Sequence, residues 1–222
     1  MSSKSKPTSH HKTKKANSKH KEPSLLDQVK KGKYLAKGMM GTVYLATDKA
    51  GNKYAYKIGK MLAKDVRESL RSEYWRENDF AMNLANKYPD QFMQLYDSRI
   101  EPSCQHKQHD FESLKMKSLP KPKQKMYAKL DASPYCSIKL WSLIDGDLRT
   151  LLASDKLSKK VFYDLYIQIV YIVYLINKDG YYHNDFHPGN IGFTRTTQKT
   201  INIFGNEIPT NGYLMKAIDF GL

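Results

Sequence analysis

Apolar and polar residues alternate along three stretches in the first quarter of the chain. Residues 33–46 have the pattern of two strands joined by a glycine-bearing turn, and residues 53–58 alternate as a third strand. Residues 61–88 then carry apolar side chains at helical spacing, with Trp75 and Phe80 on the apolar stripe. This pattern predicts three strands followed by one long helix.

The rest of the chain contains further segments of both kinds. Residues 92–96 and 135–143 are strand-like, and residues 155–178 predict a buried helix. Residues 193–215 predict an extended β-hairpin, whereas residues 102–122, rich in Lys, Pro and Ser, predict an exposed loop or insertion. Strands with one helix, followed by a helical segment with short hairpins, predict an α+β fold of two lobes.

Composition sets the first residues apart from the others. Residues 1–24 are rich in Ser, Lys and His and hold few apolar side chains, so we expect a disordered basic tail. We expect an N-terminal lobe of antiparallel sheet plus one helix over residues 25–144, with a loop insertion near residues 102–130. A partial, helical C-terminal lobe is expected over residues 145–222.

The chain of 222 residues carries a formal charge of +15, and the charge is unevenly spread. Residues 1–21 hold seven lysines and no acidic residue, and a second group of lysines lies within residues 115–129. Such segments favour a polyanionic partner, either an acidic protein or nucleic acid, bound through the N-terminal tail. The alternative is a solubilising tail and solvated faces, with no partner.

The two cysteines and the hydropathy pattern bear on location. Cys104 and Cys136 give neither a disulfide framework nor a metal-ligand spacing, so thiols in a reducing compartment are expected. The N-terminus lacks the apolar core of a secretion signal. The most apolar run, residues 161–176, is too short to span a bilayer and includes Asp164 and Gln168. We therefore expect an intracellular, cytoplasmic protein without a membrane span.

One loop carries the strongest functional signal. Residues 183–190 read His-Asn-Asp-Phe-His-Pro-Gly-Asn and follow the predicted buried helix. They resemble the catalytic loop of protein kinases, His-Arg-Asp-x-x-x-x-Asn. The resemblance implies that Asp185 orients the substrate hydroxyl and accepts its proton, and that Asn190 binds Mg²⁺. The alternative is an Asx-rich turn around Pro188.

A second motif lies downstream of this loop, as the resemblance to protein kinases implies. Residues 217–221 read Ala-Ile-Asp-Phe-Gly, an apolar lead-in followed by an acid. A carboxylate held rigidly at a strand end suits a phosphate-bound Mg²⁺ ion, which prefers oxygen ligands. The triplet resembles the Asp-Phe-Gly motif of protein kinases, which makes Asp219 the second metal ligand. Its alternative is a chance turn after a strand.

A glycine-bearing turn near the N-terminus resembles the glycine-rich loop of the same family. Glycine lets backbone N–H groups approach a phosphate closely, as Gly38 and Gly41 would do. Ala36 stands at the position of the family's first glycine, and Val43 would cover the adenine ring of ATP. The alternative is an ordinary hairpin turn, which can have the same sequence.

A lysine and a glutamate complete the resemblance to an active kinase. Lys57, in Ala-Tyr-Lys-Ile, matches the strand lysine that contacts the α- and β-phosphates, and Ala55 would line the adenine pocket. In active kinases this strand lysine pairs with a glutamate on a helix. Glu77 is preferred because apolar residues follow it at helical spacing, and Glu73 remains an alternative one turn earlier. The alternative is that Lys57, Glu73 and Glu77 are ordinary solvated charges.

Residues 140–148, Leu-Trp-Ser-Leu-Ile-Asp-Gly-Asp-Leu, resemble the hinge between the two kinase lobes. Leu140 is predicted to be the gatekeeper, the residue at the back of the adenine pocket. Ser142 lies in the segment whose backbone would bind adenine. The cofactors that the resemblance implies are ATP and Mg²⁺.

The resemblance covers residues 34–222 and implies a Ser/Thr protein kinase with a protein substrate, but it is not uniform. Asn184 replaces the usual arginine, and His187 replaces the usual lysine, as in small-molecule kinases of the aminoglycoside type. The long gap between Asn190 and Asp219 is similar to that in kinases of large DNA viruses, which would place the protein in host cytoplasm or virion. The resemblance ends at the Asp-Phe-Gly triplet, so it implies a truncated kinase core that lacks the later helices of the family. A small-molecule kinase and a pseudokinase or scaffold are the alternatives.

Overall fold

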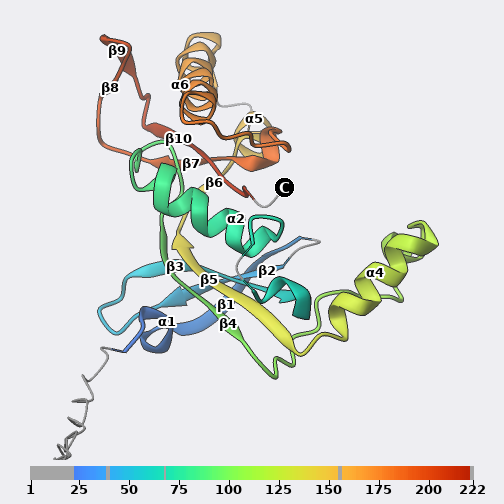
Figure 1. Cartoon of the computed structure of the whole chain (residues 1–222). Coiled ribbons are helices and arrows are strands. Elements are labelled where there is room, and N and C mark those ends of the chain that lie inside the picture. Colours follow the sequence, from blue (N-terminus) through green and yellow to red (C-terminus); the bar gives the residue numbers. More distant parts are fainter. Residues whose placement is uncertain (1–22, 39–40, 68, 155–156, 221–222) are drawn as a thin grey trace, which may run out of the picture.

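The structure is a computed structural model that describes residues 23–38, 41–67, 69–154 and 157–220 (Figure 1). Within these residues the fold is α+β, and its largest sheet has five antiparallel strands in the order β1-β2-β3-β5-β4. The strands are β1 Lys30–Lys37, β2 Thr42–Thr47, β3 Lys53–Met61, β4 Leu95–Glu101 and β5 Tyr135–Ser142.

Local turn chemistry explains why β2 and β3 pair in this register. The Asp48 carboxylate accepts hydrogen bonds from the backbone N–H groups of Ala50 and Asn52, each at 2.9 Å. Gly51 completes the turn at φ +89°, a conformation that glycine adopts without a steric penalty. The three N-terminal strands expected from the alternating pattern are therefore confirmed.

The long helix expected from residue 61 onward is only partly correct. The strand β3 continues to Met61, which pairs with Tyr135 of β5, and a 3-10 turn follows at Ala63–Asp65. Strand pairing in a buried sheet outweighs the helical spacing of this segment. The helix α2 begins later, at Glu73–Phe80, and continues as a π-helical turn at Ala81–Ala85.

A second group of elements lies on the other side of α2 (Figure 1). It consists of a small sheet, a hairpin and two helices. These are α5 Leu148–Leu152, α6 Lys159–Lys178, β6 Gly146–Asp147, β7 Ile191–Arg195, β8 Thr200–Ile203, β9 Asn206–Pro209 and β10 Tyr213–Ala217. The prediction of a hairpin over residues 193–215 is confirmed, because β7 pairs with β10 and β8 pairs with β9.

The helix α6 contributes one buried face to the core of this second group. Its N-cap is Ser158, whose hydroxyl accepts a hydrogen bond from the Val161 N–H at 3.3 Å. Leu165 and Ile172 lie on its buried stripe and belong to the same core cluster as Phe80 of α2. The core thus joins α2 to the second group. Among the described helices, none is both long and apolar enough to cross a membrane.

The segment expected as a loop insertion contains two helices, so that prediction is partly wrong. These are α3 Leu114–Lys117 and α4 Lys121–Asp131. Pro122 lies in the first turn of α4, where its missing N–H costs no hydrogen bond. Figure 1 shows α4 projecting away from the sheet.

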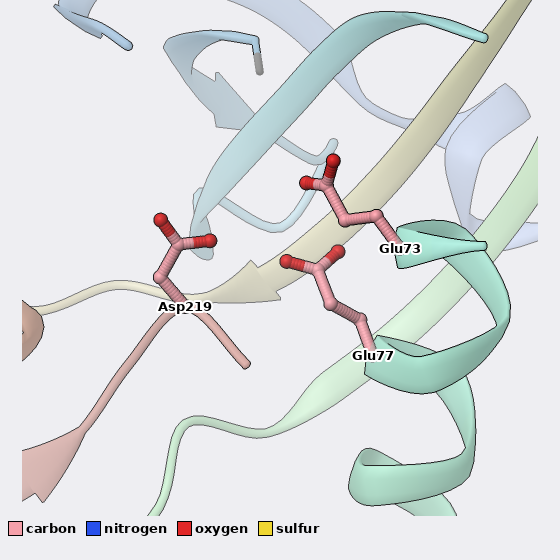
Figure 2. Close-up of side chains that lie close together, drawn as sticks. All are labelled: Glu73, Glu77 and Asp219. Carbon is pink, nitrogen blue, oxygen red and sulfur yellow. The ribbon is translucent and has the colours of Figure 1, made fainter. Parts of the chain in front are cut away.

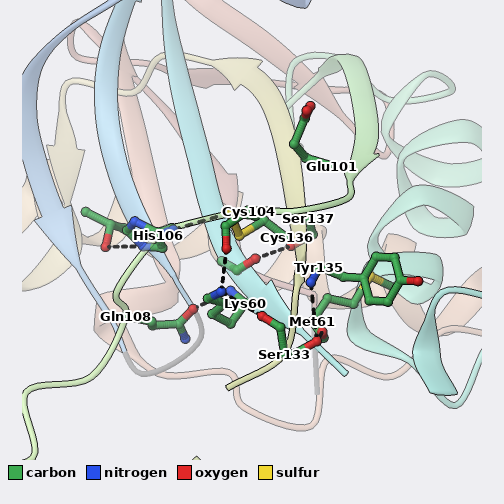
Figure 3. The surroundings of a disulfide bond; sticks show 12 residues. Lys60, Met61, Glu101, Cys104, His106, Gln108, Ser133, Tyr135, Cys136 and Ser137 are labelled. Atoms are coloured by element: carbon green, nitrogen blue, oxygen red, sulfur yellow. Dashed lines mark hydrogen bonds between the residues drawn. A yellow bond between two sulfur atoms is a disulfide. The ribbon is translucent and has the colours of Figure 1, made fainter. Parts of the chain in front are cut away.

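A disulfide bond joins Cys104 to Cys136, which contradicts the expectation of two thiols (Figure 3). Cys104 follows the end of β4, and Cys136 lies on the paired strand β5, so their Cα atoms are 5.7 Å apart. The Lys60 ammonium group donates hydrogen bonds to the carbonyl oxygens of Cys104 at 2.8 Å and Ser133 at 2.7 Å. The two ends of the insertion are therefore fastened to the sheet. The pairing of β4 with β5 made the bond possible, and the spacing of the cysteines gave no sign of it.

The predicted basic tail lies outside the described residues except for Pro23 and Ser24. Ser24 precedes the short helix α1, Leu25–Gln28, and its hydroxyl donates a hydrogen bond to the Asp97 carboxylate on β4. The chain is thus attached to the sheet from Ser24 onward.

Candidate functional site

The side chain of Lys57 joins three segments that are far apart in the sequence. Lys57 lies on β3, and its ammonium group contacts Glu77 Oε1 at 2.7 Å and Asp219 Oδ1 at 2.9 Å. It also contacts Glu73 Oε1 at 3.3 Å. Figure 2 shows the carboxylates of Glu73 and Glu77, one turn apart on α2, turned toward Asp219. The structure brings both candidate glutamates to Lys57, and Glu77 is the closer of the two.

Burial makes these contacts strong. Burial alone would lower the pKa of Lys57, but the carboxylate of Glu77 first, and then that of Asp219, raises it well above its ordinary value. Burial alone would raise the pKa of Glu77, but the ammonium groups of Lys57 and Lys139 hold it at about 2. Lys57 is therefore a fixed cation and Glu77 a fixed anion at neutral pH.

Glu73 behaves differently from Glu77, although the two share a helix face. Burial raises the pKa of Glu73 to about 7, and the attraction of Lys57 offsets only part of this effect. Its contact with Lys57 is also longer, at 3.3 Å. Glu73 therefore carries a proton over part of the neutral range, whereas Glu77 provides the permanent charge.

The predicted catalytic loop holds Asp185 and Asn190 together. The Asn190 side-chain amide donates to the Asp185 carbonyl oxygen at 3.0 Å and to Asp185 Oδ2 at 3.2 Å. His187 lies nearby, with Nε2 at 3.6 Å from Asp185 Oδ2, and its Nδ1 accepts the Gly189 N–H at 2.9 Å. The alternative prediction, a turn around Pro188, is confirmed in part, because a 3-10 turn occupies Pro188–Asn190. The turn presents the carboxylate and the amide on one side.

Two hydrogen bonds connect this loop to the segment that carries Asp219. His183 Nε2 donates to the Ile218 carbonyl oxygen at 2.8 Å, and the Ile218 N–H donates to the Asn190 carbonyl oxygen at 3.0 Å. Because Ile218 is adjacent to Asp219, the loop of Asp185 and Asn190 and the acid that contacts Lys57 form one continuous hydrogen-bonded unit.

The backbone at Asp219 has a conformation that non-glycine residues seldom adopt. Its φ is +64°, in the left-handed region. Such backbone outliers are costly and persist where the surrounding structure holds them. The residue before Asp219, Ile218, is held by hydrogen bonds, and the ring of the residue after it, Phe220, is buried. The unusual backbone directs the carboxylate toward Lys57 while Phe220 enters the core.

A column of aromatic rings fixes the position of Phe220. Its ring stacks on Phe80 of α2 with centroids 3.4 Å apart, and it lies 5.9 Å from Phe92. The His183 ring is 4.3 Å away on the catalytic-loop side. The column therefore couples α2, the catalytic loop and the Asp219 segment through apolar contact. Gly221, the last residue of the predicted triplet, lies outside the described residues.

The glycine turn lies directly beside Lys57. The Gly38 N–H donates to the Gly41 carbonyl oxygen at 2.8 Å, and the two residues between them lie outside the described residues. A Cβ atom on Gly41 would lie 3.0 Å from the Ile58 carbonyl oxygen and 3.5 Å from Lys57 Cγ. A side chain at this position would therefore have to displace the backbone of β3 by a few tenths of an ångström. Ala36 is exposed on β1, opposite Val43 on β2.

The pleat of the sheet corrects the gatekeeper prediction. Cross-strand pairing sets Lys57 opposite Lys139 and Ala55 opposite Trp141, so these four side chains share one face. Leu140 points to the other face, where it is fully buried in a separate cluster that includes Leu26, Ala46 and Ile58. Successive strand residues point to opposite faces, so the prediction was wrong by one position. Trp141, not Leu140, lies beside Ala55.

The neighbours of Ala55 are apolar, as an adenine-facing surface would be. Ala55 and Trp141 belong to one cluster, and Val43 and Leu143 pack against it. Ser142 lies at the end of β5, where its N–H donates to the Gln94 carbonyl oxygen at 2.8 Å. That N–H is therefore not available to bind a base, so Ser142 could contribute only its carbonyl oxygen or side chain.

Sequence reasoning missed one charged residue of this site. Lys139 is 2 % exposed and donates to the Glu77 carboxylate at 2.6 Å. A signal was present, because Lys139 interrupts the apolar run Ile-Lys-Leu-Trp in a strand that was predicted correctly. Ionised side chains are almost never fully buried without a partner.

A comparison of the chain with protein-family models gives no match, and neither does a comparison with curated proteins. The functional interpretation therefore depends on the residues themselves and on their geometry.

Proposed function

We propose that this chain is an ATP-dependent phosphotransferase of the protein-kinase type, which transfers the γ-phosphoryl group of ATP to a Ser or Thr hydroxyl of a protein substrate. The observation that carries the proposal is the contact of Lys57 with both Glu77 and Asp219, at 2.7 and 2.9 Å. Lys57 and Asp219 are 162 residues apart, so a chance local motif does not account for their meeting. The hydrogen bonds between Ile218 and the loop of Asp185 and Asn190 connect these contacts to the proposed catalytic residues.

Each group has a role that its environment supports. Lys57 is a permanent cation and would bind the α- and β-phosphates. Asp185 would orient the acceptor hydroxyl and take its proton as the new O–P bond forms and the bond from γ-phosphorus to the β–γ bridging oxygen breaks. The charge left on the bridging oxygen departs with ADP. Catalysis of this kind depends on positioning and electrostatics rather than on covalent chemistry.

The donor atoms fit Mg²⁺, which prefers oxygen ligands. Asp219 is half exposed, and only one of its oxygens contacts Lys57. The Asn190 amide nitrogen is engaged by Asp185, so its side-chain carbonyl oxygen is the atom left for a cation. When bound, the ion would neutralise charge on the phosphates. Asp219 and Asn190 would hold it, and Asn190 would at the same time fix Asp185.

Asp185→Asn tests the proposal directly. Without a carboxylate to accept the proton, γ-phosphoryl transfer should fall about 10²–10⁴-fold, while binding of MgATP should persist because Lys57 and Asp219 remain. The assay follows transfer from radiolabelled ATP to general protein substrates, with MgATP binding measured by calorimetry. Asp110→Asn, in the exposed insertion, is the matched control. Equal transfer by wild type and Asp185→Asn would refute the role of Asp185, and wild-type protein that neither binds nor uses ATP would refute the proposed function.

One observation favours a second candidate, a small-molecule phosphotransferase. His187 stands 3.6 Å from Asp185 in the position where protein kinases carry lysine, and small-molecule kinases of the aminoglycoside type also carry histidine there. The same assay with aminoglycosides as acceptors distinguishes the two. Labelled aminoglycoside without labelled protein would favour this candidate.

A further inference from the structure

Lys139 occupies an unusual position for an ammonium group. It lies in the middle of β5, directly across the ladder from Lys57 on β3, and its side chain is 2 % exposed. Two like charges on neighbouring strands of one face repel each other, and a buried ammonium loses its hydration. The arrangement is stable only if an anion lies between the two lysines.

Glu77 is that anion. Its Oε1 accepts from Lys57 at 2.7 Å, and its Oε2 accepts from Lys139 at 2.6 Å. Each oxygen of one carboxylate thus has its own ammonium partner, and the two partners come from different strands. The carboxylate is 4 % exposed and cannot rotate away without leaving one of the buried cations unpaired.

Lys139 is also fixed from its other side. It donates to the Tyr74 carbonyl oxygen at 2.8 Å, one turn before Glu77 on α2, and lies 4.6 Å from the centroid of the Tyr74 ring. It therefore binds both the backbone and the carboxylate of α2. None of these partners belongs to the residues that would bind the nucleotide.

The two lysines differ in what surrounds them. Lys57 also contacts Glu73 and the half-exposed Asp219, so its contacts must be shared with phosphate and metal when a nucleotide binds. The described partners of Lys139 are confined to α2 and to the ring of Trp141 at 5.9 Å. The contact of Lys139 with Glu77 therefore does not compete with the groups that would bind phosphate or metal.

We propose that Lys139 is a positioning residue for phosphoryl transfer, which holds the Glu77 carboxylate and α2 against the sheet and thereby sets the position of Lys57. The inference depends on the proposed function. It adds a third member to the pair of Lys57 and Glu77, a Lys–Glu–Lys unit that spans β3, α2 and β5.

The experiment compares Lys139→Met, which removes the charge, with Lys139→Arg, which keeps it. Steady-state rates with MgATP and a protein substrate give kcat and KM, and circular dichroism and thermal unfolding report folding. We expect Lys139→Met to lower kcat at least about tenfold, because small displacements of a catalytic group are costly. Lys139→Arg should recover part of this loss. Lys139→Gln replaces Lys139→Met if the latter does not fold; its amide keeps a hydrogen bond to Glu77 without the charge, so a smaller but measurable loss of kcat is expected.

Two controls separate positioning from general stability. Lys216→Met removes another buried lysine, whose ammonium group donates to the Pro89 and Asp90 carbonyl oxygens among the described residues, and should leave kcat unchanged in the folded protein. In a Glu77→Gln background, Lys139→Met should cause little further loss of kcat, because its effect passes through Glu77.

Unchanged kcat in Lys139→Met, or an equal loss in the Glu77→Gln background, would overturn the role of Lys139 and leave the proposed function intact. A wild-type protein that transfers no phosphate would instead refute the proposed function and, with it, this role in catalysis.

Discussion

At the scale of single residues, the site is a balance of charges around Lys57. Three carboxylates and two ammonium groups meet in a mostly buried space, and Lys57 itself is 19 % exposed. Each carboxylate responds to its own surroundings. Glu77 has two cationic partners and stays ionised, whereas Glu73 contacts Lys57 at a longer distance of 3.3 Å and holds a proton more readily. Neighbouring acids on one helix face therefore have different roles.

This difference predicts a pH-dependent stability. Burial raises the pKa of Glu73 from 4.5 to about 7, so the folded state binds more protons than the unfolded state between these values. Stability from this group is complete below about pH 4.5 and is lost as pH rises through about 7. Glu73→Gln removes the loss, so the variant should gain in stability relative to wild type as pH rises from 4.5 to about 8.

Urea unfolding at several pH values measures this gain. Glu112→Gln, at an exposed site in the insertion, is the control and should follow the wild-type pH profile. Parallel profiles for Glu73→Gln and wild type would show that Glu73 does not hold its proton in the folded protein.

At the scale of elements, α2 connects the two parts of the fold. Its polar face carries Glu73 and Glu77 toward the sheet, and its apolar face places Phe80 in the core with α6. The Phe80 ring stacks on Phe220, the neighbour of Asp219. One helix thus positions both the acid that holds Lys57 and the ring that holds the Asp219 segment.

Phe80→Ala should therefore weaken both folding and the site. Phe80 is 2 % exposed, and removal of such a ring leaves a cavity that costs about 3–5 kcal/mol of unfolding free energy. Denaturant unfolding measures the loss. Phe162→Ala, on the outer side of α6 where the side chain is 37 % exposed, should cost clearly less. Equal losses would mean that the aromatic column is not a major contributor to stability.

At the scale of the whole molecule, an insertion with α3 and α4 is fastened to the sheet at both ends. The disulfide from Cys104 to Cys136 closes a sequence separation of 32 residues, and Lys60 binds the backbone at both ends. The bond restricts the unfolded chain, and it needs no displacement of the folded chain because the two Cα atoms already lie 5.7 Å apart. The projecting α4 therefore extends from a fixed base (Figure 1).

Replacing both cysteines should lower the free energy of unfolding by about 3–4 kcal/mol, the entropy of a loop of this length. Cys104→Ser with Cys136→Ser is compared with wild type by denaturant unfolding, with and without dithiothreitol. The reductant should lower wild-type stability toward that of the double variant and leave the double variant unchanged. Two free thiols in denatured wild-type protein that was never reduced would contradict the bond.

Features that depend on neighbouring residues could be predicted from the sequence. Alternating patterns identified the strands around the glycine turn, and an apolar helical segment identified α6. The hairpin between β7 and β10 was also predicted. Asp185, Asn190 and Asp219 were selected as site residues from short motifs, and their proposed chemistry stays a prediction. All of these signals lie within a few residues of one another, where local propensity and turn chemistry act.

Only the tertiary structure decided what depends on the pairing of distant segments. The register of β5 against β3 turned Leu140 away from Lys57 and placed Lys139 and Trp141 beside the site. The pairing of β4 with β5 brought the two cysteines together. A one-residue change of register reverses every side chain of a strand, and no local pattern fixes that register when both faces are buried. The sequence alone therefore determined most of the strands, α6 and the candidate residues, and the packing of the sheet determined which side chains meet.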